Sequence, residues 1–160
     1  MSVLSQSTIA KQVSFSGVGI HTGNKVKMSV LPSTPNSGIV FKRTDLNQNN
    51  IVIPNFANVS DATLCTTVSN QFGVKVSTIE HLMAAFLGLG IDNAVVELDS
   101  QEVPILDGSA RDFVKILKET GTKNSDIPIK IIKINNHVKL EEADKYISID
   151  KSNTTLEIEF

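Results

Sequence analysis

Two neighbouring residues have the side chains best suited to chemistry in this sequence. Glu80 and His81 lie side by side in a segment that is otherwise mostly apolar. A carboxylate can take a proton from water, and an imidazole is a common zinc ligand, so the pair could serve as a base beside a metal ion. Because no second histidine follows on the same predicted helix, the segment is not the His-Glu-x-x-His zinc signature.

The same carboxylate has a purely structural explanation. Ser77 and Glu80 have the spacing of a capping box, in which the serine hydroxyl binds the Glu80 amide and the glutamate reaches back to the Ser77 amide. Local capping is commoner than catalysis, and a single histidine in an apolar segment is more often a satisfied interior residue than a ligand. Spacing alone therefore favours capping and leaves catalysis open.

Two further segments carry reactive residue types. Residues 17–23 are glycine-rich and contain His21, but they lie between predicted strands and do not open a helix, which excludes a dinucleotide fingerprint and a P-loop. Cys65 is the only cysteine, so no intrachain disulfide or cysteine-rich metal cluster can form. Its neighbours predict a buried strand, where an inert thiol is the default.

These residues are placed by a predicted α+β arrangement. A nearly all-apolar helix is predicted over residues 78–87, ending at Gly88 and Gly90, and a second helix follows Ser109 and ends at Gly121. Together with the strands they predict a β-α-α-β layer over residues 1–122, with two helices on a mostly antiparallel sheet. The predicted strands of this layer are residues 9–15, 25–31, 38–43, 62–69, 74–77 and 93–99.

The remainder of the chain has a different pattern. Residues 123–127 are predicted to be a linker, and residues 128–160 to be the strand-rich start of a second, similar domain. Its predicted strands are residues 128–134, 138–141, 146–150 and 154–160. Their apolar face has no covering layer in this sequence. We therefore expect a truncated second domain, whose face is covered by a missing C-terminal half or by self-association.

Composition excludes several classes of protein. Hydrophobic residues make up 41% and charged residues 20%, which is typical of a globular protein rather than a disordered one. A net charge of -2, no tryptophan and one tyrosine argue against nucleic-acid binding. The longest strictly apolar run, residues 82–87, is far shorter than the about 20 residues that span a bilayer. The first residues do not form a signal peptide, so we expect a soluble, cytoplasmic protein without a membrane span.

Five motifs together resemble one family. In order along the chain they are Gly17-Val-Gly-Ile-His-Thr-Gly23, Arg43-Thr-Asp45, Thr78-Ile-Glu-His-Leu82, Gly88-Leu-Gly-Ile-Asp-Asn93 and Pro104-Ile-Leu-Asp-Gly-Ser109. They resemble the N-terminal half of the UDP-3-O-acyl-N-acetylglucosamine deacetylases, the zinc-dependent amidases of lipid A biosynthesis in Gram-negative bacteria. The resemblance runs over essentially the whole chain.

The resemblance implies roles for individual residues. Glu80 matches the family's catalytic general base, and His81 matches one of its three zinc ligands. Leu64 and Cys65 match the stretch that lines the site near the acyl passage, and Lys145 matches a lysine that contacts the nucleotide diphosphate. The implied substrate is UDP-3-O-acyl-N-acetylglucosamine, whose 2-acetamido group is hydrolysed with release of acetate. The implied cofactor is Zn²⁺.

The resemblance also implies that these residues are not sufficient for activity. The family's other two ligands, a histidine and an aspartate of a His-x-x-x-Asp helix, lie in its C-terminal half, and no such spacing occurs after residue 122. We therefore expect the 160-residue chain to be inactive alone and to bind zinc weakly or not at all. The implied fold is two similar layers with the site at their seam. The alternative is a non-enzymatic, β-rich interaction or substrate-binding module.

Overall fold

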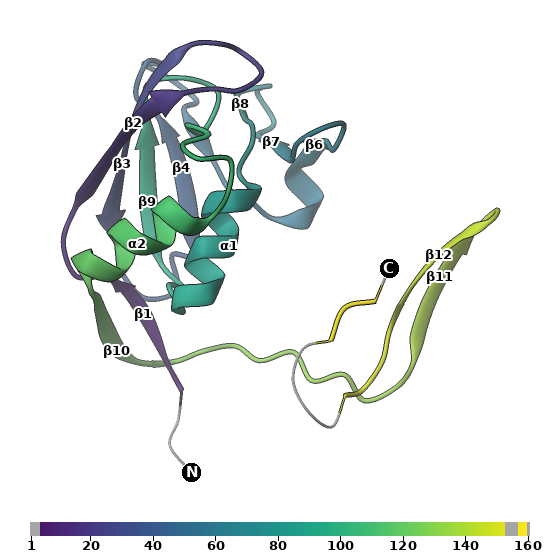
Figure 1. Cartoon of the computed structure of the whole chain (residues 1–160). Coiled ribbons are helices and arrows are strands. Elements are labelled where there is room, and N and C mark those ends of the chain that lie inside the picture. The colour runs from purple at the N-terminus through teal and green to yellow at the C-terminus, as the bar shows by residue number, and fades with distance from the viewer. Residues whose placement is uncertain (1–3, 153–156, 160) are drawn as a thin grey trace. The chain divides into compact units, whose positions relative to one another are not determined.

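The computed structural model describes residues 4–152 and 157–159 and divides the chain into two compact units. The first unit is Met1–Ile129 and the second is Lys130–Phe160. Figure 1 shows the course of the chain through both.

A five-stranded sheet forms the centre of the first unit. Its strand order is β2-β3-β9-β4-β5, and the neighbours are antiparallel except for the parallel pair β4 and β9. The strands are β2 (Val13–Val18), β3 (Lys25–Pro32), β4 (Ile39–Arg43), β5 (Ile51–Val52) and β9 (Ala94–Leu98). In β3 and β9, buried residues alternate with more exposed ones, as expected for a sheet with one covered face.

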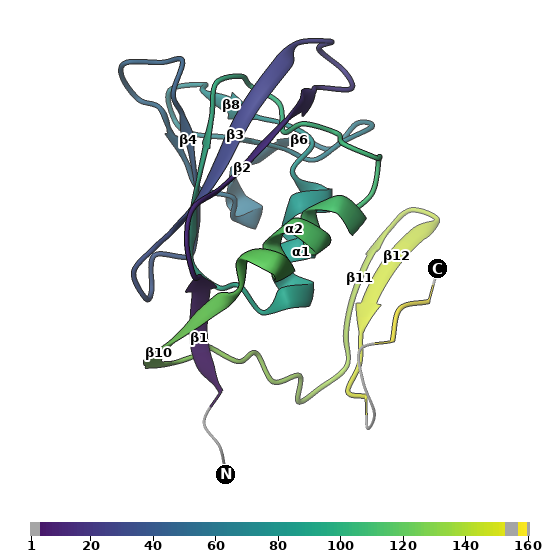
Figure 2. The ribbon, with the colours of Figure 1, turned by 60° about the vertical axis from the view of Figure 1, so that its left-hand side comes forward.

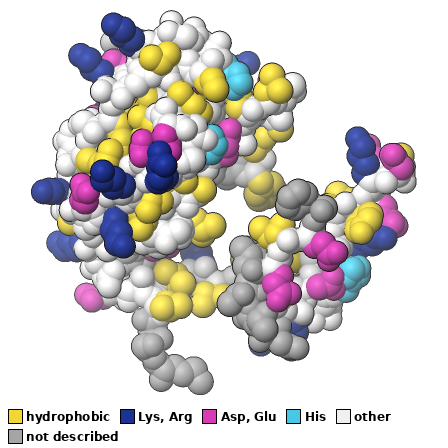
Figure 3. Space-filling model, viewed as in Figure 1, with side chains coloured by type: hydrophobic (Ala, Val, Ile, Leu, Met, Phe, Trp, Pro, Cys, Tyr) yellow, Lys and Arg dark blue, Asp and Glu magenta, His cyan; other side chains and the backbone are white. Residues whose placement is uncertain are grey.

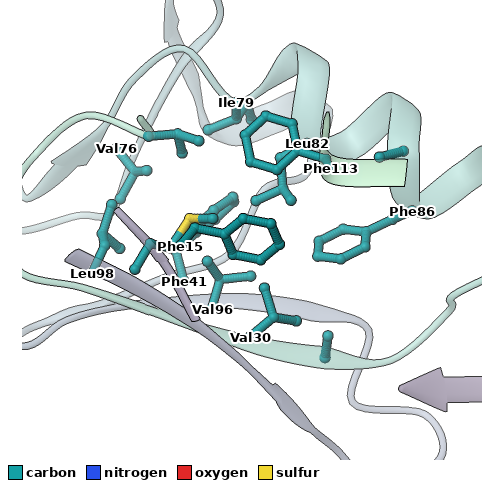
Figure 4. Close-up of a cluster of buried hydrophobic side chains, with 14 of the residues drawn as sticks. Phe15, Val30, Phe41, Val76, Ile79, Leu82, Phe86, Val96, Leu98 and Phe113 are labelled. Atoms are coloured by element: carbon teal, nitrogen blue, oxygen red, sulfur yellow. The ribbon is translucent and has the colours of Figure 1, made fainter. Parts of the chain in front are cut away.

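Two helices cover one face of this sheet (Figures 1 and 2). They are α1 (Glu80–Leu89) and α2 (Arg111–Thr120). Phenylalanine side chains from both layers meet in the core between them, where the Phe15 and Phe113 ring centroids lie 5.4 Å apart with the rings tilted (Figure 4). The predicted α+β class, with two helices on a mostly antiparallel sheet, is confirmed.

Backbone conformation sets both ends of α1. Thr78 has a φ of 57°, which is incompatible with a right-handed helix, so α1 begins two residues later than predicted. At the other end Gly90 adopts the left-handed conformation with a φ of 65°. The Gly90 and Ile91 amides then donate to the Leu87 and Phe86 carbonyls at 3.1 and 2.9 Å, which closes the last turn.

Two smaller sheets flank the central one. The first contains β6 (Val59–Asp61), β7 (Thr67–Ser69) and β8 (Lys75–Val76), preceded by the 3₁₀ turn η1 (Phe56–Asn58). The predicted strand 62–69 is wrong over residues 62–66, because Leu64 has a φ of 65° and cannot continue a strand. Only its last residues form β7.

The second small sheet corrects two predictions. The predicted strand 9–15 is two strands, β1 (Ser5–Ile9) and β2, which separate at a bend because they pair with different partners. The expected linker 123–127 lies within β10 (Thr122–Pro128), which pairs antiparallel with β1. Local sequence could not reveal this pairing, since the two strands lie at opposite ends of the first unit. The division of the chain into an N-terminal domain and a truncated second domain stays a prediction.

The described part of the second unit is built on a β-hairpin. Strands β11 (Val138–Glu142) and β12 (Lys145–Ile149) pair through the turn that contains Ala143. The prediction of strands at 138–141 and 146–150 is confirmed to within one residue. Residues 129–134 are described and form no strand, so the prediction for 128–134 is wrong beyond Pro128. The predicted strand 154–160 falls largely outside the described residues.

None of the helices in the part of the chain that the structure describes has the length and hydrophobicity needed to cross a bilayer.

Arg43 links the central sheet to the β6-β7-β8 sheet. Its guanidinium is nearly buried and donates to both carboxylate oxygens of Asp45, at 2.8 and 2.6 Å, while Nη1 donates to the Lys75 carbonyl at 2.9 Å. The hydrogen bond and charge of Arg43 outweigh partial burial and hold the pKa of Asp45 below its usual range. The bidentate pair therefore helps to fix the end of β4 against β8.

We expect Asp45→Asn to lower the free energy of unfolding by about 1–2 kcal/mol at pH 7, because it leaves the Arg43 charge without its partner. A depressed pKa contributes stability above the ordinary aspartate value of 3.8, and this contribution is lost as the pH falls below it. The difference between the variant and the wild type should therefore shrink below about pH 3.8 in urea titrations. The control Glu97→Gln, which breaks the half-exposed pair with Lys42, should cost less than about 1 kcal/mol. A pH-independent difference for Asp45→Asn would contradict this account.

Phe113→Ala should lower the free energy of unfolding far more than a truncation on the exposed side of α1. Phe113 is fully buried, so its removal should cost about 3–5 kcal/mol. Leu87 is 80% exposed, and Leu87→Ala should change the unfolding free energy by less than about 0.5 kcal/mol. Urea unfolding followed by circular dichroism compares the two variants. Similar losses for both variants would contradict the burial of Phe113 in the core.

Candidate active site

Glu80 and His81 occupy the first two positions of α1, and both are partly buried. One carboxylate oxygen of Glu80, Oε2, accepts a hydrogen bond of 3.0 Å from the Thr66 amide. Helix α1 is anchored beneath them by Ile79 and Leu82, which point into the core in Figure 4. The start of the helix, which carries the two side chains, is thus packed firmly against the core.

The capping-box prediction is wrong. Within the described residues, no side-chain hydrogen bond caps the start of α1. The Ser77 hydroxyl instead accepts a hydrogen bond of 3.0 Å from the Thr67 hydroxyl, and Glu80 is bound to Thr66 rather than to the Ser77 amide. The reason is the left-handed Thr78 between them, which turns the chain so that Ser77 does not sit at the helix cap. The Glu80 carboxylate is therefore not used for capping.

Residues 64–66 form the segment beside Glu80. Leu64 is 88% exposed and left-handed, Cys65 is partly buried with its Sγ 3.7 Å from the Thr67 hydroxyl, and Thr66 donates to Glu80. The prediction of a buried strand around Cys65 is wrong, because this segment bends between β6 and β7. The structure thus brings Leu64 and Cys65 to the neighbourhood of Glu80. Their role as substrate contacts stays a prediction.

A second carboxylate, Glu102, is completely buried close to the start of α1. Oε1 accepts hydrogen bonds from the His21 amide at 3.0 Å and the Thr78 hydroxyl at 2.9 Å. Oε2 accepts from the Thr22 amide at 2.9 Å and the Thr22 hydroxyl at 2.7 Å. Burial raises the pKa of Glu102, but these hydrogen bonds outweigh it and the net pKa lies below the usual glutamate range.

The hydrogen bonds of Glu102 connect the glycine-rich segment 17–23 with the turn before α1. His21 is exposed and is attached through its backbone amide rather than its ring. Through Glu102, the 17–23 segment is therefore connected to Thr78, which precedes Glu80 by two residues. Figure 3 shows that hydrophobic side chains also reach the visible surface of the first unit among charged ones.

Lys145 begins β12 in the second unit and is exposed. Glu80 and His81 belong to the first unit. Its predicted contact with a nucleotide diphosphate stays a prediction.

The described residues do not supply a complete zinc site. Among residues 4–152 and 157–159, no group of three His, Cys, Asp or Glu side chains is placed so that it could hold a metal ion. A structural zinc site needs four protein ligands and a catalytic one needs three. His81 could provide one of them, so these residues alone do not fit the metal.

Three residues near the candidate site were not found from the sequence. Thr66 acts through its backbone amide, and Thr78 adopts a conformation that is unusual for a β-branched residue, so neither leaves a pattern in the sequence. Glu102 stands between Gln101 and the apolar Val103, where an acidic residue would ordinarily be assigned to the surface. The sequence signal for a buried Glu102 is its position directly before the apolar stretch Val103-Pro104-Ile105.

Comparison with known proteins identifies the relatives of this chain. The family model described as LpxC, UDP-3-O-acyl N-acetylglycosamine deacetylase, matches residues 6–160. Proteins named UDP-3-O-acyl-N-acetylglucosamine deacetylase from Shewanella sp. (strain ANA-3) and Shewanella baltica (strain OS155) are each 46% identical over 144 residues. The matches cover 90% of this chain but 47% of each relative, so the chain spans about half the length of these curated relatives. A family match over nearly all of its residues shows that this chain belongs to the LpxC family of UDP-3-O-acyl N-acetylglycosamine deacetylases.

Proposed function

We propose that the whole protein containing these residues hydrolyses the 2-acetamido group of UDP-3-O-acyl-N-acetylglucosamine, releasing acetate in lipid A biosynthesis. Family membership supports the reaction class. The observation that carries the proposal in this structure is the state of Glu80. Its carboxylate is free of the capping role, is oriented by the Thr66 amide and stands next to His81 at the start of a helix that packs one side on the core.

Glu80 is the general base in this proposal. Its carboxylate takes a proton from a water molecule as the water oxygen forms a bond to the carbonyl carbon of the acetamido group. The resulting tetrahedral species collapses when the C–N bond breaks and the nitrogen receives a proton, which Glu80 returns in this proposal. The products are acetate and the free 2-amino sugar nucleotide. The Thr66 amide keeps the base in one orientation through the cycle.

His81 is the residue of this chain that we propose as a zinc ligand. The described residues do not complete the site, so the remaining ligands would come from the other half of the whole protein. We assign Leu64 and Cys65 to contacts with the acyl chain and Lys145 to the diphosphate. A cytoplasmic location belongs to the same proposal, and it is consistent with an unpaired Cys65.

The partner that we propose for the second unit is the other half of the whole protein. The β11–β12 hairpin exposes several large apolar side chains, and the relatives are about twice as long as this chain. The exposed side chains are Val138, Leu140, Tyr146, Ile147 and Ile149.

In the whole protein, Glu80→Gln should lower kcat by about 10²- to 10⁴-fold, because glutamine cannot accept the proton from water. Acetate release from UDP-3-O-acyl-N-acetylglucosamine measures the effect. The matched control is Glu119→Gln on the exposed end of α2, which should retain full activity. Equal activity of the two variants would overturn the assignment of Glu80. A wild-type protein that binds the substrate without releasing acetate would instead favour a binding module.

The 160-residue chain should hold much less than one equivalent of zinc after dialysis, since His81 is one ligand of an incomplete set. Elemental analysis of the chain and of the whole protein provides the comparison. The whole protein should hold about one equivalent, and His81→Ala should reduce it. One tightly bound equivalent in the 160-residue chain would contradict the shared site.

A further inference from the structure

The backbone around Glu102 is fixed against the segment that leads into α1. The Ser77 amide donates to the Gln101 carbonyl at 2.8 Å, and the Val103 amide donates to the Ser77 carbonyl at 3.1 Å. Glu102 lies between these two bonds, and the neighbouring Thr78 donates its hydroxyl to the Glu102 carboxylate. Glu102 is thus held next to the Thr78 turn by backbone hydrogen bonds of its two neighbours and by the hydrogen bond to its side chain.

The glycine-rich segment approaches the same carboxylate from the other side. The His21 and Thr22 amides and the Thr22 hydroxyl all donate to Glu102. A side chain on Gly19 would collide with the Glu102 carboxylate and the Thr22 hydroxyl, so only glycine permits this close approach. The Ile105 amide also donates to the Val18 carbonyl at 3.0 Å, which fastens the start of the loop.

One carboxylate oxygen joins the two segments directly. Oε1 of Glu102 accepts from both the His21 amide and the Thr78 hydroxyl, although these residues are far apart in sequence. Thr78 is 3% exposed and left-handed, a conformation that a β-branched residue keeps only when its surroundings hold it there. Two residues later the chain reaches Glu80 and then His81.

We propose that Glu102 is a positioning residue for the deacetylation, a buried carboxylate that clamps the 17–23 loop to the Thr78 turn and thereby sets the position of Glu80 and His81. This inference rests on the proposed function. Glu102 does not touch the reacting groups in this account. It acts through Thr78, whose position determines where α1 begins, and it keeps the His21 loop beside that start.

Hydrogen exchange tests the clamp without reference to activity. In Glu102→Gln of the whole protein, the His21 and Thr22 amides should exchange at least about tenfold faster, while amides of the β3–β9 pair keep their wild-type rates. The control Glu97→Gln removes a partly exposed carboxylate of β9 that pairs with Lys42, and it should leave all these amides unchanged. Unchanged exchange at His21 and Thr22 in Glu102→Gln would overturn the clamp.

Kinetics tests its connection to the reaction. Thr78→Val keeps the β-branched shape but loses the hydroxyl, and it should lower kcat about 10- to 100-fold with little change in KM. Thr78→Ser restores the hydroxyl and should restore most of kcat. A kcat for Thr78→Val equal to that of the wild type, or an equal loss in Thr78→Ser, would overturn the positioning role. These variants also decide the matter if Glu102→Gln does not fold.

The two proposals fail in different ways. A wild-type protein that releases no acetate would refute the proposed function and with it the positioning role, while hydrogen exchange would still show whether Glu102 holds the two segments. An active wild type with an unaffected Thr78→Val variant would refute the positioning role alone.

Discussion

A buried carboxylate must be surrounded by hydrogen-bond donors, because an ionised group without partners is very costly inside a protein. Glu102 is fully buried, and within the described residues its donors come from the His21 amide, the Thr22 amide and hydroxyl, and the Thr78 hydroxyl. This requirement couples segments that are distant in sequence. If the glycine-rich loop and the turn before α1 moved apart, the Glu102 carboxylate would lose hydrogen bonds or become exposed to water. This requirement restrains the arrangement near Glu80.

The core of the first unit supports this arrangement from below. The apolar residues of α1 pack on the central sheet, and Ile79 and Leu82 at the start of the helix point into the core (Figure 4). Left-handed residues at Leu64 and Thr78 bend the chain on either side of the β7–β8 pair. The bends bring the Thr66 amide to Glu80 and the Thr78 hydroxyl to Glu102. Conformations that are unfavourable alone are thus held where the proposed chemistry requires them.

Periodicity predicted the parts of the fold that depend on burial. Helix α2, most of the central strands and the β11–β12 hairpin repeat apolar residues with the period of their element, and α1 is visible as an apolar run that ends at glycines. Pairing between distant segments is not visible in this way, so residues 123–127 are predicted to be a linker although they lie in β10 and pair with β1. Capping was predicted for Glu80 because spacing does not reveal the left-handed Thr78. The motifs indicate Glu80 and His81. The contributions of Thr66 and Glu102 depend on contacts between distant segments, so they are seen only in the structure.

The central claim is that Glu102 is an ionised carboxylate held by donors from two segments. The most direct measurement is an NMR titration of its side-chain carboxyl carbon in isotopically labelled protein. Because the hydrogen bonds lower the pKa of Glu102, its signal should keep the ionised shift at pH values where ordinary glutamates are already protonated. A carboxyl that titrates within or above the ordinary glutamate range would contradict this account.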